Sequence, residues 1–288
     1  MKTSVIVSTY NQPAWLKKVL YGYAVQSVRG FELIVADDGS GAETRAVIER
    51  VCGETGLEVL HLSHQDRGYR RSVILNRATL AAGGEYLIFT DGDCVPRSDF
   101  VARHQELARP GRFLSGGAVM IPLETSRAIS KDDVTTGRFA RAGWLGAHGW
   151  WPGRHFLRLL EAGPLPKLLD RMTTTRASWN LNNSSTWREA VLEANGMDNE
   201  MTYGGADRAL GERLERLGLR GIQARHRLVC VHLDHGRPYR TCGSVVKNKR
   251  NRASQRRSGS VRAPSGISQL GHDPGFTREL VRGGEVVA

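Results

Sequence analysis

The chain has 288 residues, of which 40% are hydrophobic and 24% charged, and its formal net charge is +12. This composition excludes collagen, low-complexity disorder and short disulfide scaffolds. No apolar run approaches the roughly 18 residues of a membrane-spanning helix, and the short apolar stretch near the start is too small for a signal-peptide core. We therefore expect a cytoplasmic protein, with peripheral attachment to the inner face of the membrane as the alternative.

The first 93 residues repeat a strand followed by a helix. The apolar, β-branched run 4–9 predicts a strand, and helically spaced apolar residues over 14–27 predict the helix after it. Three further strands are expected in the same alternation, at 32–40, 57–62 and 85–93. This alternation is typical of an α/β fold with a parallel sheet, in which ligands bind beyond the carboxyl ends of the strands.

Polar side chains collect where these strands end, which predicts a polar site at one edge of the sheet. They are Ser8, Tyr10 and Asn11, then Asp37 and Asp38, then His64 and Gln65, and finally Asp91 and Asp93. The first strand-to-helix turn lacks the G-x-G-x-x-G fingerprint, and the sequence contains no G-x-x-x-x-G-K-[ST] loop. Both absences disfavour nicotinamide-dependent hydride transfer and P-loop hydrolysis.

The pattern changes after residue 110. A further strand is expected at 113–121, whereas 124–177 is rich in Gly, Pro, Trp and Arg and is interpreted as a partly helical excursion over the site. Periodicity then returns with an amphipathic helix that carries Leu210, Leu214 and Leu217 on one side. The run LVCVHLDH at 228–235 predicts a final strand.

Two pairs of aspartates give the clearest indication of chemical function. Asp91 and Asp93 flank a glycine directly after an apolar strand, so they could present oxygens to a hard divalent cation and to a ribose or phosphate. The alternative is a solvated turn. Asp37 and Asp38 precede Gly-Ser, and one of them could cap the next helix while the other accepts hydrogen bonds from a base or from ribose hydroxyls.

Four motifs in this part of the chain give a resemblance to a known family. In their order and spacing, VIVSTYN, IVADDGS, RGYRRSVILNRA and YLIFTDGDCVP resemble the nucleotide-binding half of family 2 glycosyltransferases with the A-type fold. The resemblance implies a Rossmann-like, mostly parallel central sheet. It also implies that Ser8, Tyr10 and Asp38 hold a uracil base and that Arg70 approaches the nucleotide.

The resemblance also implies a metal site. In the family, the aspartate pair matching Asp91 and Asp93 handles the ribose and the metal-bridged diphosphate, and the residue matching Asp93 is the direct metal ligand. A histidine after the last core strand supplies a further ligand, which points to His232, with His235 in reserve. A set of carboxylate and imidazole ligands suits Mn²⁺, and Mg²⁺ is the alternative. A lone histidine in such a place would otherwise be structural.

The carboxyl half is similar to a segment shared by bacterial relatives and animal galactosyltransferases. The similarity runs through NLNNSSTWREAVLEANGMDNEMTYGGADRALGERLERLG. It implies that Asp207 deprotonates the acceptor hydroxyl and that Tyr203 and Gly205 contact the sugar or acceptor. One departure is Ala206, which stands where the family has a glutamate that helps to bind acceptor or donor hydroxyls. Altered acceptor binding, reduced activity and an introduced substitution are all open explanations.

Two further features have two interpretations each. The tryptophans Trp144, Trp150 and Trp151 could stack on sugar rings at the acceptor side, Trp151 above all, or could pack in the core or a lid. Residues 236–288 hold eleven Lys and Arg against three Asp and Glu, and 247–262 has seven basic residues with no acid and no aromatic. We expect this stretch to be a solvated or disordered arm that touches anionic lipid headgroups or an acidic glycan carrier, with nucleic acid disfavoured.

The resemblance therefore predicts a metal-dependent inverting glycosyltransferase, a hexosyl- or N-acetylhexosaminyl-transferase of polysaccharide biosynthesis. It would use a nucleotide-sugar of the UDP class and a glycan, lipid-linked or small-molecule acceptor. We divide the chain into a nucleotide-sugar-binding half at 1–122, an acceptor-binding and catalytic half at 123–236, and a basic extension at 237–288. The alternatives are a nucleotidyltransferase, which would need a glycine-rich basic loop after the first strand, and a non-catalytic protein that binds nucleic acid or an anionic surface.

Overall fold

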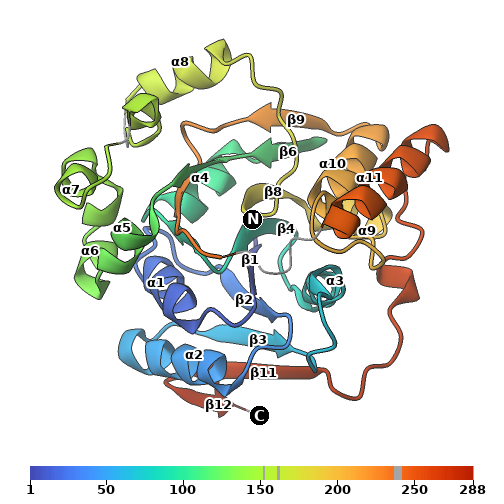
Figure 1. The fold of residues 1–288 in the computed structure, drawn as a ribbon, viewed down its shortest axis with the longest axis horizontal. Helices are drawn as coiled ribbons and strands as arrows, with labels where there is room; N and C mark the ends of the chain where they lie inside the picture. The colour runs from blue at the N-terminus through green and yellow to red at the C-terminus, as the bar shows by residue number, and fades with distance from the viewer. Residues whose placement is uncertain (152, 161–162, 237–241, 288) are drawn as a thin grey trace.

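A nine-stranded sheet forms the centre of the molecule (Figure 1). The computed structural model describes residues 1–151, 153–160, 163–236 and 242–287. The order of the strands is β12 (Glu285–Val287), β11 (Thr277–Arg282), β3 (Val59–Ser63), β2 (Glu32–Asp37), β1 (Thr3–Thr9), β4 (Tyr86–Asp91), β8 (Asn183–Trp187), β6 (Arg112–Ser115) and β9 (Arg220–Gln223). The four strands from β3 to β4 are parallel, whereas β11 and β8 join them antiparallel. The predicted α/β class with a parallel central sheet is confirmed.

Helices cover both faces of this sheet because its parallel strands are apolar on both sides. Val5 and Val7 pack in one cluster and Ile6 in another, as the twofold side-chain period of a strand requires. The first cluster includes α1 (Pro13–Ala24) and α2 (Ala42–Thr55), and the second includes α3 (Arg71–Ala81), α9 (Arg188–Glu193) and α10 (Ala206–Arg216). Figure 1 shows α1 and α2 on one side of the strands and α3 on the other.

A second sheet of three strands joins a strand of the carboxyl half to two strands from the first 122 residues. Its order is β5 (Cys94–Pro96), β10 (Val229–His232) and β7 (Gly117–Met120). The single strand expected at 113–121 is in fact two strands, β6 in the large sheet and β7 in the small one. They divide at Gly116, where a Cβ atom would lie 2.3 Å from the side chain of Asn183, so only glycine fits. The final strand predicted at 228–235 corresponds to β10.

The excursion after residue 122 is partly helical, as predicted. It contains α5 (Leu123–Ala128), α6 (Lys131–Thr135), η1 (Arg138–Ala140), α7 (Ala142–Ala147), η2 (Gly153–Arg158) and α8 (Leu165–Met172), while α4 (Phe100–Leu107) precedes it. The hydroxyl of Ser130 and the carboxylate of Asp133 form a capping box that begins α6. In the parts of the chain that the structure describes, no helix is both long and apolar enough to cross a bilayer.

The basic stretch at 247–262, expected to be a solvated or disordered arm, is folded, as are the other residues of 242–287. They form α11 (Cys242–Arg257), which contacts α10, then η3 (Ile267–Gln269) and the strands β11 and β12. Figure 1 shows β11 in red beside β3 in light blue. The buried face of α11 carries the polar residues Asn248 and Gln255 rather than apolar ones, so apolar periodicity could not reveal the helix. The large sheet thus takes strands from all three segments, 1–122, 123–236 and 237–288.

Candidate active site

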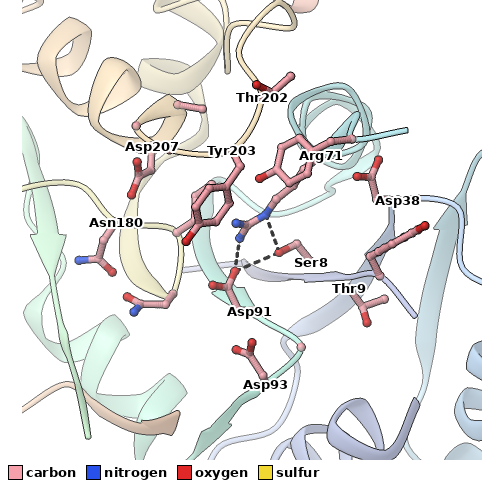
Figure 2. Close-up of a pocket in the computed structure, with 18 of the residues that line it drawn as sticks. Ser8, Thr9, Asp38, Arg71, Asp91, Asp93, Asn180, Thr202, Tyr203 and Asp207 are labelled. Carbon is pink, nitrogen blue, oxygen red and sulfur yellow. Dashed lines mark hydrogen bonds and ion pairs between the residues drawn. The ribbon is translucent and has the colours of Figure 1, made fainter. Parts of the chain in front are cut away.

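A cavity of about 840 Å³ lies at the carboxyl ends of β1, β2 and β4 (Figure 2). The register of the sheet explains why polar groups gather there, since Ser8 pairs with Asp91 and Thr9 with Asp37. Most of the residues predicted for the site lie on its wall: Ser8, Tyr10, Asp38, Asp91, Asp93, Tyr203, Gly205, Asp207, His232 and His235. Segments more than 200 residues apart in the sequence therefore meet in one place.

Two predicted site residues lie elsewhere. The guanidinium of Arg70 donates to Asp273 at 3.0 Å, and its neighbour Arg71 lines the cavity instead. Arg70 is the N-cap of α3 and Arg71 is its first residue. The backbone geometry at the start of this helix decides which of the two side chains faces the site, and the sequence pattern does not specify that geometry. Trp151 is 79% exposed and is not among the residues that line the cavity. Trp144 and Trp150 pack against the hydrophobic core, which agrees with the packing alternative for these two.

Ser8, Arg71 and Asp91 form a charged group in the middle of the cavity. Nε of Arg71 donates to Oγ of Ser8 at 3.0 Å, the Ser8 hydroxyl donates to Oδ1 of Asp91 at 3.0 Å, and the guanidinium of Arg71 pairs with the same carboxylate. Figure 2 shows these contacts as dashed lines. Burial raises the pKa of Asp91, while the charge of Arg71 acts in the opposite direction. Burial alone would lower the pKa of Arg71, but Asp91 and Tyr69 raise it, so Arg71 stays cationic.

Asp38 is buried at the end of β2 with both carboxylate oxygens occupied. Oδ1 lies 2.9 Å from Nε2 of His64, and Oδ2 accepts the main-chain N–H of Arg70 at 3.1 Å. Burial raises the pKa of Asp38, and the hydrogen bond with His64 opposes the rise. Its neighbour Asp37 accepts the N–H of Ser40 at 2.8 Å, so the turn alternative holds for that aspartate.

Tyr10 lies at the mouth of the cavity and is 40% exposed. Its hydroxyl donates to Oδ2 of Asp66 at 2.9 Å, and this hydrogen bond is the main reason that the pKa of Tyr10 is raised. The ring is therefore held from the loop after β3 while one face stays open to solvent. A planar ring in that position can stack on a flat ligand.

Asp93, His232 and His235 lie close together on the cavity wall. The pairing of His232 with Cys94 in the small sheet places Nε2 of His232 3.6 Å from Oδ1 of Asp93. Nε2 of His235 lies 2.8 Å from Oδ2 of the same carboxylate. Burial would raise the pKa of Asp93, but the hydrogen bond with His235 and the nearby His232 lower it.

Asp93 and His232 fit a divalent cation. Two ligands at about 2.1 Å from one ion lie at most about 4.2 Å apart, which accommodates the 3.6 Å between Asp93 and His232. Nδ1 of His232 is buried without a hydrogen-bond partner among the described residues, and oxygen and imidazole donors suit Mn²⁺. The thiol of Cys94 also lies within 4.8 Å of this group. Burial raises its pKa well above the usual range, so the thiol stays protonated and is a poor ligand for a hard ion.

Asp207 approaches the cavity from the opposite side, at the second position of α10. Its Oδ1 accepts the N–H of Arg208 at 2.8 Å, and Figure 2 shows its carboxylate directed towards Asn180 and Asp91. Gly204 and Gly205 precede the helix with φ values of 101° and 102°, a region that other residues rarely adopt. Ala206 also lines the cavity, with a methyl group where a glutamate would add a carboxylate.

Sequence reasoning missed the residue that fixes this loop. Asn248 of α11 is fully buried, and its Nδ2 donates to the carbonyl oxygens of Thr202, Tyr203 and Gly204 at 2.8, 3.1 and 3.1 Å. It lies in the basic stretch that was expected to be disordered, so no local signal marked it. Asn180 and Asn182, which also line the cavity, lie within the carboxyl-half motif but were not singled out.

The family assignment rests on a direct match. The family model for glycosyl transferase family 2 matches residues 4–162, more than half of the chain. The chain therefore belongs to glycosyl transferase family 2, and its enzyme class is that of the glycosyltransferases. An uncharacterized glycosyltransferase of Bacillus subtilis, YfnE, is 27% identical over 275 residues, which cover 82% of this chain and 65% of YfnE.

A shorter match links the chain to a characterised enzyme. Poly(ribitol-phosphate) beta-N-acetylglucosaminyltransferase TarS of Staphylococcus aureus is 34% identical over 95 residues, or 32% of this chain. That match covers 16% of TarS, and a match to CgeD of Bacillus subtilis covers 25% of that relative, so the chain spans a small part of both.

Solved structures share the fold. S. aureus TarS 1–349 in complex with UDP-GlcNAc superimposes with a TM-score of 0.56 at 16% identity, covering 88% of this chain and 66% of the other. A mannosyltransferase from Pyrobaculum calidifontis in complex with GDP-Man and Mn²⁺ gives 0.54 at 20% identity, covering 93% and 67%. At such identities the likeness shows the fold alone, which is the A-type glycosyltransferase fold.

Proposed function

We propose that this chain is a metal-dependent inverting glycosyltransferase that moves a sugar from a UDP-sugar to an acceptor hydroxyl. One observation carries the proposal: Asp93 and His232 lie 3.6 Å apart in the same cavity that Asp207 enters from the other side. A donor bound between these groups would have its diphosphate at the metal ligands and its sugar facing Asp207. The family assignment favours this function over nucleotidyl transfer, and nucleotide-sugars occur in the complexes of TarS and of the mannosyltransferase.

The donor's nucleotide would bind along the strand ends. Asp38 is held by His64 and by the N–H of Arg70, so its carboxylate is already oriented to accept a hydrogen bond from a uracil imide. Tyr10 would stack on the base, and Ser8 and Asp91 would bind the ribose. Arg71 lies between Ser8 and Asp91 and would supply positive charge to the diphosphate.

Asp93 and His232 would hold Mn²⁺ or Mg²⁺, with His235 as the reserve ligand. A divalent cation held there would supply positive charge opposite the leaving diphosphate. His235 in turn keeps Oδ2 of Asp93 in place and lies 3.0 Å from Nε2 of Gln12, so the carboxylate has a fixed orientation.

Asp207 would act as the general base. Its carboxylate would take the proton of the acceptor hydroxyl while the hydroxyl oxygen forms a bond to the anomeric carbon, and the bond from that carbon to the diphosphate oxygen breaks. Attack from the face opposite the leaving group inverts the configuration. Tyr203 packs edge-on against Tyr69 with ring centroids 6.4 Å apart, and its ring, with Gly205, would contact the sugar or acceptor.

A thermal-shift screen tests this function. UDP-glucose, UDP-GlcNAc, UDP-galactose and GDP-mannose are each added with Mn²⁺ and with EDTA, and the release of nucleoside diphosphate is measured in parallel. We expect one UDP-sugar to raise the melting temperature only when Mn²⁺ is present, since a ligand that binds the folded state stabilises it by mass action. The proposal fails if none of the donors stabilises the protein, or if UTP with a sugar phosphate releases pyrophosphate instead.

The acceptor would be a glycan, a lipid-linked sugar or a small molecule. Peripheral attachment to an anionic membrane surface would use the basic face of α11, and it predicts retention of the protein on vesicles that contain anionic lipid at low salt. Vesicles of neutral lipid are the control. If both kinds of vesicle retain the protein to the same extent, the proposed attachment to an anionic membrane is wrong.

A further inference from the structure

Arg208 differs from the other charged residues of the cavity because its guanidinium has no partner in the part of the chain that the structure describes. It follows Asp207 in the first turn of α10, lines the cavity and is exposed. Among the residues that the structure describes, none forms a hydrogen bond or ion pair with its side chain. Arg71, the other arginine on the wall, is paired with Asp91.

The structure also explains why Arg208 is unpaired. Glu212 lies one helical turn further along α10, at the spacing where an arginine and a glutamate normally pair. Its carboxylate instead accepts hydrogen bonds from Arg252 and Arg256 of α11. Both arginines bind Oε1 of Glu212. Burial would raise the pKa of Glu212, but these two guanidinium groups lower it, so the carboxylate stays charged and paired with α11. Because α11 packs against α10, its arginines bind Glu212, which would otherwise be placed to pair with Arg208.

Few acidic side chains on the cavity wall could pair with Arg208. Position 206 is an alanine, and of the described residues that line the cavity, the only acid besides Asp38, Asp91 and Asp93 is Asp207. The exposed cations of α11 that have no ion pair within the described chain are Lys247, Lys249, Arg250 and Arg257. None of these four cations is among the described residues that line the cavity, so they can serve as controls for Arg208.

We propose that the acceptor carries an oxyanion, a phosphate or a carboxylate, which Arg208 binds next to the hydroxyl that Asp207 deprotonates. The proposal rests on the function given above and narrows its acceptor class. A guanidinium can bind a phosphate or carboxylate with two parallel hydrogen bonds, so it would fix the orientation of the acceptor as well as its position. Arg208 is thus assigned as a specificity-determining residue.

Paired acceptors test this assignment. Each neutral methyl glycoside is compared with its 6-phosphate and its uronic acid, using the donor that stabilises the protein, and kcat/KM is measured for transfer. We expect wild type to prefer an anionic member of a pair by about 10-fold to 100-fold, the usual range for a charge-assisted hydrogen bond. Arg208→Ala should remove the preference, Arg208→Lys should restore part of it, and Arg257→Ala, which removes an exposed cation from α11, should leave it unchanged. The separate phosphate and carboxylate arms identify which oxyanion is used.

Direct binding keeps the test independent of turnover. Inorganic phosphate and methyl phosphate are titrated by calorimetry into protein loaded with UDP and Mn²⁺, and binding should be lost in Arg208→Ala and kept in Arg257→Ala. The proposal is overturned if wild type treats neutral and anionic acceptors alike, if Arg257→Ala weakens the preference as much as Arg208→Ala, or if Arg208→Ala abolishes metal-dependent stabilisation by UDP. The last result would make Arg208 a donor residue. Absence of any donor binding by wild type would instead contradict the proposed function.

Discussion

The two sides of the cavity are built differently. On the donor side, the functional groups stand at the ends of parallel strands, and each carboxylate has a fixed partner: Asp38 has His64, Asp91 has Arg71 and Asp93 has His235. On the acceptor side, they stand on a glycine-containing loop and the first turn of a helix. That loop is held by Asn248, which lies 44 to 46 residues further along the chain. The donor side thus has its carboxylates held by side-chain partners, of which His235 comes from the carboxyl half, whereas the acceptor-side loop is held by the main-chain contacts of Asn248.

The largest expected effect concerns Asp93. Asp93→Asn removes a charge from the metal site, so both metal-dependent donor binding and transfer should be lost. Turnover should fall by about 10⁴-fold. A divalent cation would stabilise the developing negative charge at least as well as two neutral hydrogen-bond donors, and each such donor raises turnover by about 10²-fold to 10³-fold. The measurements are calorimetry with UDP and Mn²⁺ and the rate of transfer. Asp132→Asn, an exposed aspartate of α6, is the matched control, and a variant at Asp93 that still bound UDP through Mn²⁺ would contradict the metal assignment.

Asp207 should separate the two sides of the cavity. Asp207→Asn keeps the shape of the side chain but removes the base, so turnover should fall by about 10²-fold to 10⁴-fold. Stabilisation by the UDP-sugar with Mn²⁺ should persist, because the donor side is intact. Full transfer activity in this variant would show that another group takes the proton.

Asn248 tests whether the acceptor side depends on α11. Asn248→Asp has nearly the same shape but replaces the donating amide with an oxygen that faces three carbonyl oxygens. We expect kcat/KM for transfer to fall about 10-fold or more, which corresponds to the loss of a buried hydrogen bond, while the slower hydrolysis of the donor by water changes less. Asn251→Asp makes the same chemical change one turn along α11 and should have little effect. Equal loss of transfer and donor hydrolysis would mean that Asn248 supports the whole fold rather than the loop.

The effect that is smallest near neutral pH concerns His104, which contacts β8. His104 is fully buried, with Nδ1 2.7 Å from Oγ of Ser185 and Nε2 3.0 Å from Oδ1 of Asn183, and burial lowers its pKa from 6.5 to about 3. The unfolded chain therefore binds a proton below pH 6.5 that the folded chain does not. This contribution to stability is complete above pH 6.5 and is lost between pH 6.5 and 3, at about 1.4 kcal/mol for each pH unit.

Urea unfolding at several pH values measures this loss. His104→Gln cannot titrate, so its stability should depend less steeply on pH in the same window, even if the variant is less stable at neutral pH. Parallel pH profiles for wild type and His104→Gln would show that other groups cause the acid sensitivity.

The donor side could be predicted from the sequence because its signals are local. Runs such as SVIVST specify buried parallel strands, and parallel strands bring their carboxyl ends to one edge, so Ser8, Asp38 and Asp91 had to meet. The same reasoning could not choose between Arg70 and Arg71, because the turn into α3 decides which guanidinium enters the cavity. It also did not predict that the strand expected at 113–121 divides at Gly116, because that division depends on the side chain of Asn183 from a distant segment.

The acceptor side was only partly predictable. A motif placed Asp207 and Tyr203, but the support for their loop comes from a helix whose buried face is polar. Gln255 lies between Arg213 at 2.8 Å and Asp198 at 2.7 Å, and such matched polar contacts leave no apolar period in the sequence. A basic, polar stretch can therefore be a folded helix when its partners are polar in a complementary way.

The antiparallel pairing of β11 with β3 has a consequence for biosynthesis. While the protein leaves the ribosome, β3 can pair with β2, but its outer edge has no partner until residues 277–282 emerge. Unpaired strand edges recruit other chains, so the newly made protein is exposed to aggregation through this edge until β11 has been made. A chain truncated before residue 277 should accumulate in inclusion bodies even though every cavity-lining residue has already been made.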